Sequence, residues 1–310
     1  MAKIAFVFPG QGAQAVGMGQ DFVSRYPAAR SIMERADEAL GFALSDIIFN
    51  GPEAELKQTV NTQPALLAVS TAILEVLKER DLQPVCTAGH SLGEYSALVA
   101  SGVMSFEDAV RTVRARGQFM EQAVPSGQGA MAAVLGAERE ALAALCSEIT
   151  ASGTAVELAN VNCPGQIVIS GTAQGVSEVV SRGKEIGAKR VMPLEVSGPF
   201  HSSLMRPAAE QLADVLAKLE LRDARIPVIA NVTAQQVEEA GEIRRLLEQQ
   251  VYSPVLWEDS VRTMLSLGID TFVEIGSGSV LAGLIKKTDR SAAVISVNSV
   301  EALDKLSELA

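Results

Sequence analysis

The sequence predicts an α/β protein with a core built on a parallel sheet and a smaller ferredoxin-like unit inserted into that core. Three observations lead to this prediction. Apolar runs such as Ile4–Phe8 are continuous rather than alternating, as in strands covered on both faces. Helical stretches separate these runs along the chain. Between residues 130 and 196 the order becomes strand, helix, strand, strand, helix, strand, which is typical of a ferredoxin-like unit.

The composition is that of a globular protein, because 48% of the 310 residues are hydrophobic and 20% are charged. A net charge of −11 argues against nucleic acid as a partner. The N-terminal apolar run is too short for a signal peptide or a membrane span, so we expect a cytoplasmic protein without membrane contact. The cysteines, Cys86, Cys146 and Cys163, are too widely spaced for a zinc site, and no metal is predicted.

The stretch after residue 84 predicts a nucleophilic serine. An apolar run, Val85–Ala88, is followed at once by Gly89-His90-Ser91-Leu92-Gly93 and then by a helical pattern. A Gly-x-Ser-x-Gly turn between strand and helix exposes the serine hydroxyl at the helix N-terminus, where backbone N–H groups favour developing negative charge. Its two glycines let strand and helix approach without a Cβ clash. The alternative is that Ser91 only caps the helix.

The loop after the first strand, Pro9-Gly10-Gln11-Gly12-Ala13-Gln14, has part of the glycine pattern of a dinucleotide-binding loop. The spacing fails, since residue 15 is alanine and no acidic residue completes the pattern. We expect either a simple strand-ending turn or a loop beside Ser91 that offers a backbone N–H to the site.

Apolar periodicity predicts two helices before the serine turn, Tyr26–Leu40 and Pro64–Arg80. A third helix begins after it at Ser105, where Asp108 follows with the spacing of a capping box. Arg111 and Arg114 of this third helix are expected to be solvated.

Arg116 of the same helix differs, because Val113, Phe119 and Met120 place it at the border of the apolar face. Gly117 beside it costs helix stability and indicates close approach of another backbone or a ligand. A guanidinium at such a border needs a partner. Two alternatives stay open: an internal salt bridge, or bidentate recognition of a substrate carboxylate.

The inserted unit begins near Ser126, where Gly127-Gln128-Gly129 looks like a linker. We predict a small subdomain of residues 126–195 within a core formed by residues 1–125 and 196–310. Its strands are expected at 130–135, 156–160, 166–170 and 190–196, and its helices at 138–152 and 173–186.

The chain beyond the subdomain supplies the second of only two histidines, His201. The other, His90, adjoins Ser91, and a neighbour across such a turn usually points away from the hydroxyl. His201 is therefore the histidine available as general base. Further strands are predicted at 226–230, 271–275 and 292–297, and helices at 241–251, 280–286 and 302–310.

Motifs along nearly the whole chain occur in the order found in malonyl-CoA:acyl carrier protein transacylases, and the sequence resembles that family. They are Pro9–Gln14, Gly89–Tyr95, Arg116–Met120, Asn162–Gln166, Phe200-His201, Gln250 before Ser253-Pro254-Val255, and Val273–Gly276. One departure is that Ser277 and Ser279 stand where the family has Pro and often Lys. We expect this loop to affect carrier docking rather than chemistry.

The resemblance implies a hydrolase-like core and a ping-pong reaction. It implies that Ser91 attacks the thioester of malonyl-CoA with His201 as general base. The malonyl-Ser91 ester is then attacked by the phosphopantetheine thiol of acyl carrier protein. The Gln11 and Leu92 backbone N–H groups are implied as the oxyanion hole.

The resemblance also implies residues that bind the acyl group. Arg116 holds the malonyl carboxylate, and Gln250 orients His201 through its main-chain carbonyl. Phe200 and Asn162 are implied at the substrate pocket, where the bulk of Phe200 favours malonyl over methylmalonyl by crowding an α-methyl group. The implied enzyme is a monomeric malonyltransferase of fatty-acid biosynthesis that uses malonyl-CoA and phosphopantetheinylated acyl carrier protein and needs no cofactor.

Two other functions stay open. An esterase-type serine hydrolase would use the same Ser–His chemistry with water as acceptor; the lack of a His-Gly-Gly-Gly loop and of a clear acid partner speaks against it, as does Arg116. A docking protein that binds carrier proteins without turnover is the other alternative. The intact set of Ser91, Arg116 and His201 speaks against that one.

Overall fold

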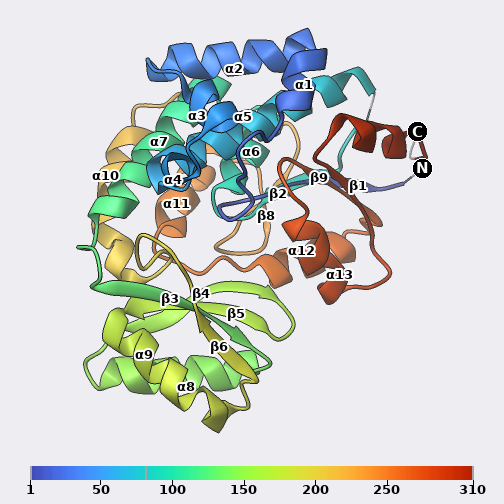
Figure 1. Cartoon of the computed structure of the whole chain (residues 1–310). Coiled ribbons are helices and arrows are strands. Elements are labelled where there is room, and N and C mark those ends of the chain that lie inside the picture. The colour runs from blue at the N-terminus through green and yellow to red at the C-terminus, as the bar shows by residue number, and fades with distance from the viewer. Residues whose placement is uncertain (1, 81, 309–310) are drawn as a thin grey trace.

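A computed structural model describes residues 2–80 and 82–308 and contains two sheets, one in each part of the molecule (Figure 1). The larger sheet has the order β10-β9-β1-β2-β7-β8. Neighbouring strands are parallel except β7 and β8, which are antiparallel. The predicted parallel core sheet is confirmed. Its strands are β1 (Ile4–Phe8), β2 (Cys86–Gly89), β7 (Val228–Ile229), β8 (Gln236–Val237), β9 (Thr271–Ile275) and β10 (Ala293–Val297).

The first strand shows why its apolar run is continuous. Ile4, Phe6 and Phe8 point into the larger hydrophobic cluster, which is formed mainly with α2, α5, α6, α7 and α10. Ala5 and Val7 point into a second cluster on the other face, formed with α12 and α13. Burial on both faces removes the polar alternation that a half-exposed strand would show.

Helices cover both faces of this sheet, and short 3₁₀ segments link some of them (Figure 1). The helices are α1 (Gln20–Arg25), α2 (Pro27–Leu40), α3 (Leu44–Asn50), α4 (Glu53–Leu56), α5 (Thr59–Leu77), α6 (Gly93–Ala100), α7 (Phe106–Gln122), α10 (Arg206–Leu216), α11 (Ala240–Gln250), α12 (Trp257–Ser266) and α13 (Val280–Thr288). The 3₁₀ segments are η1 (Lys78–Arg80), η3 (Ser203–Met205) and η4 (Val300–Glu308). The last of these replaces the tail helix predicted at 302–310, of which residues 309 and 310 lie outside the described chain.

Helix α5 begins at Thr59, five residues before the predicted start at Pro64. Pro64 has no N–H for the carbonyl one turn earlier, Val60 O, and the Arg114 guanidinium donates to that oxygen at 3.5 Å. Arg114 also lies 4.2 Å from the centre of the Phe42 ring. The prediction that Arg114 is solvated is therefore wrong, because this half-buried cation satisfies a carbonyl that a proline leaves free.

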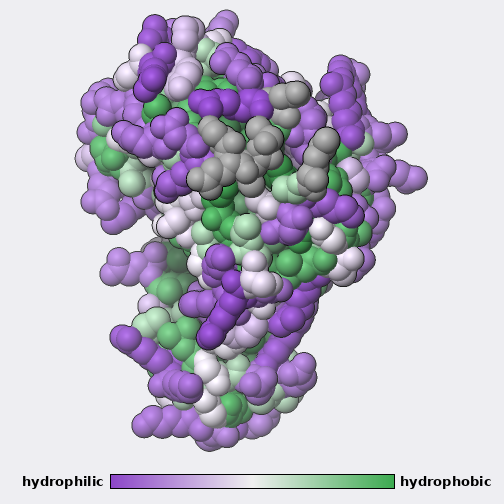
Figure 2. Space-filling view, turned by 90° about the vertical axis from the view of Figure 1, so that its right-hand side faces the viewer, coloured by the Kyte–Doolittle hydropathy of each residue, from purple (hydrophilic) through white to green (hydrophobic). Residues whose placement is uncertain are grey.

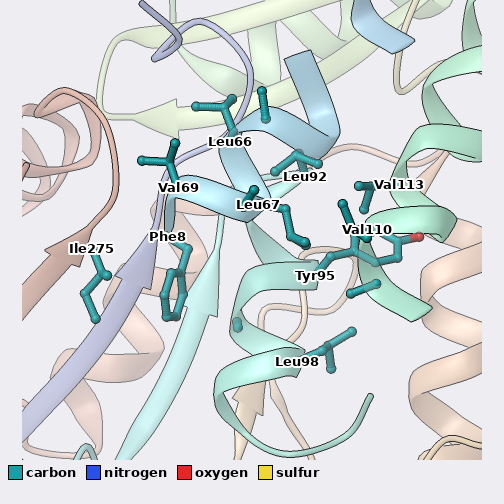
Figure 3. Packing of buried hydrophobic residues seen from close by; sticks show 14 of the residues in the cluster. Phe8, Leu66, Leu67, Val69, Leu92, Tyr95, Leu98, Val110, Val113 and Ile275 are labelled. Carbon is teal, nitrogen blue, oxygen red and sulfur yellow. The ribbon is translucent and has the colours of Figure 1, made fainter. Parts of the chain in front are cut away.

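The same helix is the one segment of the described chain long and apolar enough to span a bilayer. Of its most apolar window, within Thr59–Arg80, 89% is buried inside the protein. Figure 3 shows Leu66, Leu67 and Val69 of α5 within this packing, near Phe8 of β1 and Ile275 of β9. The helix is thus a core element between the sheet and the outer helices.

Helix α7 starts as its sequence predicts, and its glycine has a packing reason. The Ser105 hydroxyl accepts the Asp108 N–H at 3.1 Å and donates to the Asp108 carboxylate at 2.8 Å. A Cβ on Gly117 would lie 2.8 Å from the carbonyl oxygen of Thr59. Glycine therefore lets α7 approach the start of α5 at the height of Arg116.

The smaller sheet has the antiparallel order β4-β5-β3-β6, which is the strand order of a ferredoxin-like unit. Ala132 and Val134 of β3 pack against its two helices, whereas Met131 and Ala133 face the main hydrophobic cluster. The fold class is confirmed, and the exact boundaries at 126 and 195 stay a prediction. The elements are β3 (Gly129–Leu135), α8 (Arg139–Ala151), β4 (Val156–Cys163), β5 (Gln166–Thr172), α9 (Ala173–Arg182), η2 (Gly183–Ile186) and β6 (Arg190–Pro193).

Backbone hydrogen bonds join the two parts of the molecule. Val255 donates to Ala159 O at 2.8 Å, and Val161 of β4 donates to Val255 O at 2.9 Å. This pairing fixes β4 beside the segment that follows α11. On the face drawn in Figure 2 hydrophilic side chains cover both parts, and hydrophobic residues reach the surface in scattered groups.

Candidate active site

Ser91 lies in a strained turn between β2 and α6. Its φ of 52° is in the left-handed region, which non-glycine residues seldom adopt. A Cβ on Gly89 would collide with the backbone of Gly93, and one on Gly93 would collide with Phe8 O. The Ser91 hydroxyl caps no N–H of α6, and its own N–H donates to Asn231 Oδ1 at 2.7 Å. The turn therefore presents the hydroxyl to the surrounding pocket rather than to the helix.

His201 reaches Ser91 from the chain that follows the smaller sheet. Its Nε2 lies 2.7 Å from Ser91 Oγ, and its Nδ1 lies 2.8 Å from the backbone oxygen of Gln250. A carbonyl oxygen only accepts, so Nδ1 carries the proton and Nε2 is the free acceptor for the serine proton. Burial and the positive charge of Arg116 disfavour the imidazolium form and lower the pKa of His201 to about 3.

His90 serves elsewhere, although it adjoins the serine. Its Nε2 lies 2.8 Å from Asn162 Oδ1, and its ring lies beside that of Trp257 with 5.7 Å between the centres. Burial lowers the pKa of His90 as well. His90 therefore fixes Asn162 at the pocket wall and makes no hydrogen bond to the Ser91 hydroxyl.

Arg116 is fully buried, with 1% of its surface exposed, and its guanidinium lies in the same pocket. Its Nη1 donates to Gln63 Oε1 at 2.7 Å, and its Nη2 donates to Gln250 Oε1 at 2.9 Å and to Ser91 Oγ at 3.1 Å. No carboxylate forms an ion pair with it among the described residues. Of the two alternatives, the internal salt bridge is not what the structure shows.

The two backbone N–H groups implied for an oxyanion hole belong to Gln11 and Leu92. Both residues line the pocket beside Ser91. In the part of the chain that the structure describes, neither N–H donates a hydrogen bond to the protein. A Cβ on Gly10 would collide with His90 O, so glycine lets the first loop approach the serine turn.

Ser277, one of the two serines that depart from the family pattern, lies against the loop that contains Gln11. Ser277 is buried, and its hydroxyl donates to the carbonyl oxygen of Ala13 at 2.6 Å. On the other side, the Gln11 side chain donates to Thr59 Oγ1 at 3.1 Å. These contacts hold the Gln11 loop from two directions, so Ser277 supports this loop from within.

The pocket has a volume of about 450 Å³ and lies between the core and the smaller sheet. Phe200 and Asn162 both lie in its wall, as do Met131 and Val168 of the smaller sheet. Leu194, Val196 and Val280 are apolar lining residues that remain more than a third exposed, and the exposed residues Lys57 and Glu195 line the same pocket. Apolar side chains together with a few polar groups around Ser91 are typical of a small-molecule pocket.

Three residues of the site were not singled out from the sequence: Gln63, Asn231 and Glu94. Gln63 is a buried polar residue within the apolar helix α5, which was an available signal. Asn231 lies two residues after the end of β7, at the carboxyl end of the sheet, where functional side chains gather. Glu94 lies in the first turn after Ser91 and within the family motif Gly89–Tyr95, but nothing in the sequence assigned it a role.

Other chemistry finds little support in the described residues. Across residues 2–80 and 82–308, no group of three or more His, Cys, Asp or Glu side chains is placed to hold a metal ion. The cysteines are free and buried, and burial raises the pKa of Cys86 and of Cys146 to about 12. These thiols therefore stay protonated and are poor nucleophiles.

Comparison with known proteins identifies the fold and the family. The acyl transferase domain family matches residues 5–305. The chain is 54% identical over 304 residues to the malonyl CoA-acyl carrier protein transacylase of Bacillus subtilis strain 168, covering 98% of this chain and 96% of that protein. It is 48% identical to the protein of the same name from Staphylococcus aureus strain MRSA252, covering 97% of each.

Solved structures agree with these relatives. An acyl carrier protein S-malonyltransferase from Vibrio cholerae superposes with a TM-score of 0.96 at 46% identity, covering 98% of this chain and all of that one. A malonyl-transacylase in complex with a type II polyketide acyl carrier protein gives 0.96 at 41% identity, with both chains fully covered. The chain therefore belongs to the acyl transferase family and, within it, to the malonyl CoA-acyl carrier protein transacylases.

Proposed function

We propose that the protein moves a malonyl group from malonyl-CoA to the phosphopantetheine thiol of acyl carrier protein through an ester on Ser91. The observation that carries this proposal is the distance of 3.1 Å between Ser91 Oγ and the Nη2 of Arg116, a buried cation that forms no ion pair with the described carboxylates. In a malonyl thioester a carboxylate stands one methylene group beyond the reacting carbonyl. A pocket that holds a nucleophile and a cation side by side matches this spacing.

In the first half-reaction Ser91 Oγ attacks the thioester carbonyl carbon while His201 Nε2 takes the hydroxyl proton. The Gln11 and Leu92 N–H groups donate to the oxygen that becomes negative, each contributing about 3 kcal/mol. Collapse of the tetrahedral intermediate breaks the bond to sulfur. The CoA thiol leaves with the proton from His201, and the malonyl group remains on Ser91.

The second half-reaction reverses these steps with a different thiol. The carrier's phosphopantetheine thiol gives its proton to His201 and attacks the ester carbonyl. The bond to Ser91 Oγ breaks, and the serine recovers the proton. The Gln250 carbonyl keeps the His201 ring in place through both halves, which fits a triad in which a main-chain oxygen replaces the acid.

Acyl selectivity follows from the walls of the pocket. Arg116 pairs with the malonyl carboxylate, and Gln63 and Gln250 hold its guanidinium in position. Phe200 and Asn162 border the acyl group, and Phe200 disfavours an α-methyl substituent. We further propose that acyl carrier protein is the partner, that the enzyme acts as a cytoplasmic monomer, and that the scheme requires no cofactor.

The first prediction is a covalent malonyl ester on Ser91. Intact-protein mass spectrometry after mixing with malonyl-CoA is expected to show a malonyl-sized increment, which moves to phosphopantetheinylated carrier once that is added. The variant Ser91→Ala is expected to fold and to show no increment. Decay to free malonate without carrier would identify a hydrolase instead, and a wild-type protein without any increment would contradict the catalytic proposal.

The second prediction concerns Arg116→Ala. Loss of a charge-assisted pair in a desolvated pocket is expected to lower kcat/KM for malonyl-CoA about 100-fold, while slow transfer of acetyl groups remains. Arg114→Ala on the same helix is the matched control, because Arg114 lies outside the pocket against Phe42. It is expected to cost stability and to keep the malonyl preference. Equal losses for malonyl and acetyl donors in Arg116→Ala would refute the role in recognition.

The third prediction concerns the charge of His201. Because burial and Arg116 lower the pKa of His201 to about 3, its imidazole stays neutral as the pH falls from 8 to 5. The chain has only two histidines, so NMR of the ring protons, with His90→Asn for assignment, can follow His201 directly. No titration of its signal is expected in this range. A midpoint near 6.5 would show that the free enzyme does not hold the base neutral.

A further inference from the structure

A buried carboxylate lies directly behind the reactive groups. Glu94, on the first turn of α6, has 2% of its surface exposed and forms no ion pair with the described basic residues. Its Oε2 accepts the side-chain N–H of Gln250 at 2.7 Å and the backbone N–H of Asn231 at 3.1 Å. Burial raises the pKa of Glu94 to about 7. Burying such a group costs stability, so its contacts have to compensate for that cost.

The Gln250 side chain links this carboxylate to the substrate cation. Its Nε2 donates to Glu94 Oε2 and, at 3.0 Å, to Ser91 O, while its Oε1 accepts from Arg116 at 2.9 Å. A carboxamide can rotate by about 180°, which swaps the positions of its oxygen and its nitrogen. Here a carboxylate that only accepts lies on one side and a guanidinium that only donates lies on the other. One orientation satisfies both, and the reversed one satisfies neither.

We propose that Glu94 is a positioning residue that fixes the direction of the Gln250 carboxamide and thereby aligns Arg116 for the malonyl carboxylate. This proposal rests on the proposed function. Glu94 touches neither the hydroxyl of Ser91 nor the imidazole of His201, so its effect is indirect. With Gln250 turned over, an NH₂ group would face the guanidinium, and Arg116 would move away from the place where it meets the substrate.

The second contact of Glu94 supports the serine turn. Glu94 accepts the backbone N–H of Asn231. The Asn231 side chain in turn accepts the Ser91 N–H on its Oδ1 and donates from its Nδ2 to Gly89 O at 2.7 Å. The Glu94 carboxylate thus binds two residues of the site. One is Asn231, which binds the backbone of Ser91, and the other is Gln250, which binds the guanidinium of Arg116. Such shared support explains why an acidic residue is useful at this position.

The test is Glu94→Gln, which keeps the size of the side chain and removes its charge. A glutamine can donate as well as accept, so it tolerates both orientations of Gln250. At pH 8 the ratio of kcat/KM for malonyl-CoA to that for acetyl-CoA is expected to fall about tenfold. Gln250→Met, which keeps the backbone carbonyl for His201, is expected to lower the ratio similarly. The double variant is expected to add nothing, since both changes break one linkage.

The matched control is Glu274→Gln. Glu274 is also fully buried; its carboxylate accepts the Leu281 and Ala282 N–H groups of α13 and the hydroxyl of Ser296 in β10, and it makes no hydrogen bond to Arg116 or Gln250. This control is expected to lower the melting temperature and to leave the ratio unchanged. An unchanged ratio in folded Glu94→Gln, or independent losses in the double variant, would overturn the proposal. If Glu94→Gln does not fold, Gln250→Met provides the test instead. An unchanged ratio of malonyl-CoA to acetyl-CoA kcat/KM in that variant would then overturn the proposal.

Failure of the proposed function itself would be distinguishable, because the unaltered protein would then transfer no malonyl group to the carrier.

Discussion

The site depends on one buried cation, the Arg116 guanidinium, whose hydrogen bonds to the described residues go to uncharged oxygens. Taking the Arg116 guanidinium out of water costs several kcal/mol, and hydrogen bonds to Gln63, Gln250 and Ser91 offset part of this cost. The surrounding packing serves this arrangement. Gly117 brings α7 close to the start of α5, where the buried Gln63 side chain accepts a hydrogen bond from the Arg116 guanidinium. The Arg116 guanidinium is thereby held beside Ser91, and it remains able to bind a substrate carboxylate.

A second constraint is backbone strain at the two reacting residues. Ser91 and His201 have φ values of 52° and 58°, and Ala234 is the one other non-glycine residue of the described chain with positive φ. Such conformations cost about 1–3 kcal/mol each and persist where the surroundings fix them. Glycines on both sides of the serine turn and the amide of Asn231 fix the first. At His201 the Gln250 carbonyl orients the imidazole ring, so the acceptor geometry exists before substrate binds.

The sequence was most informative where chemistry and local structure coincide. A continuous apolar strand followed by Gly-x-Ser-x-Gly predicted the serine turn, and helical spacing placed Arg116 at an apolar border. Contacts between distant residues were not accessible in this way, since Ser91 and His201 are 110 residues apart and Glu94 and Gln250 are 156 apart. Apart from the family resemblance, His201 was identified as the base by eliminating His90. The start of α5 was placed wrongly because Arg114, a tertiary partner, compensates for Pro64 within the helix.

The central claim is that the serine and the cation serve the two ends of one malonyl group. The most direct measurement is a crystal structure of the protein after reaction with malonyl-CoA in the absence of carrier. We expect an ester on Ser91 Oγ, with the malonyl carboxylate about 2.8 Å from the Arg116 nitrogens. An ester whose carboxylate points out of the pocket, with Arg116 still bound only to Gln63 and Gln250, would contradict the claim.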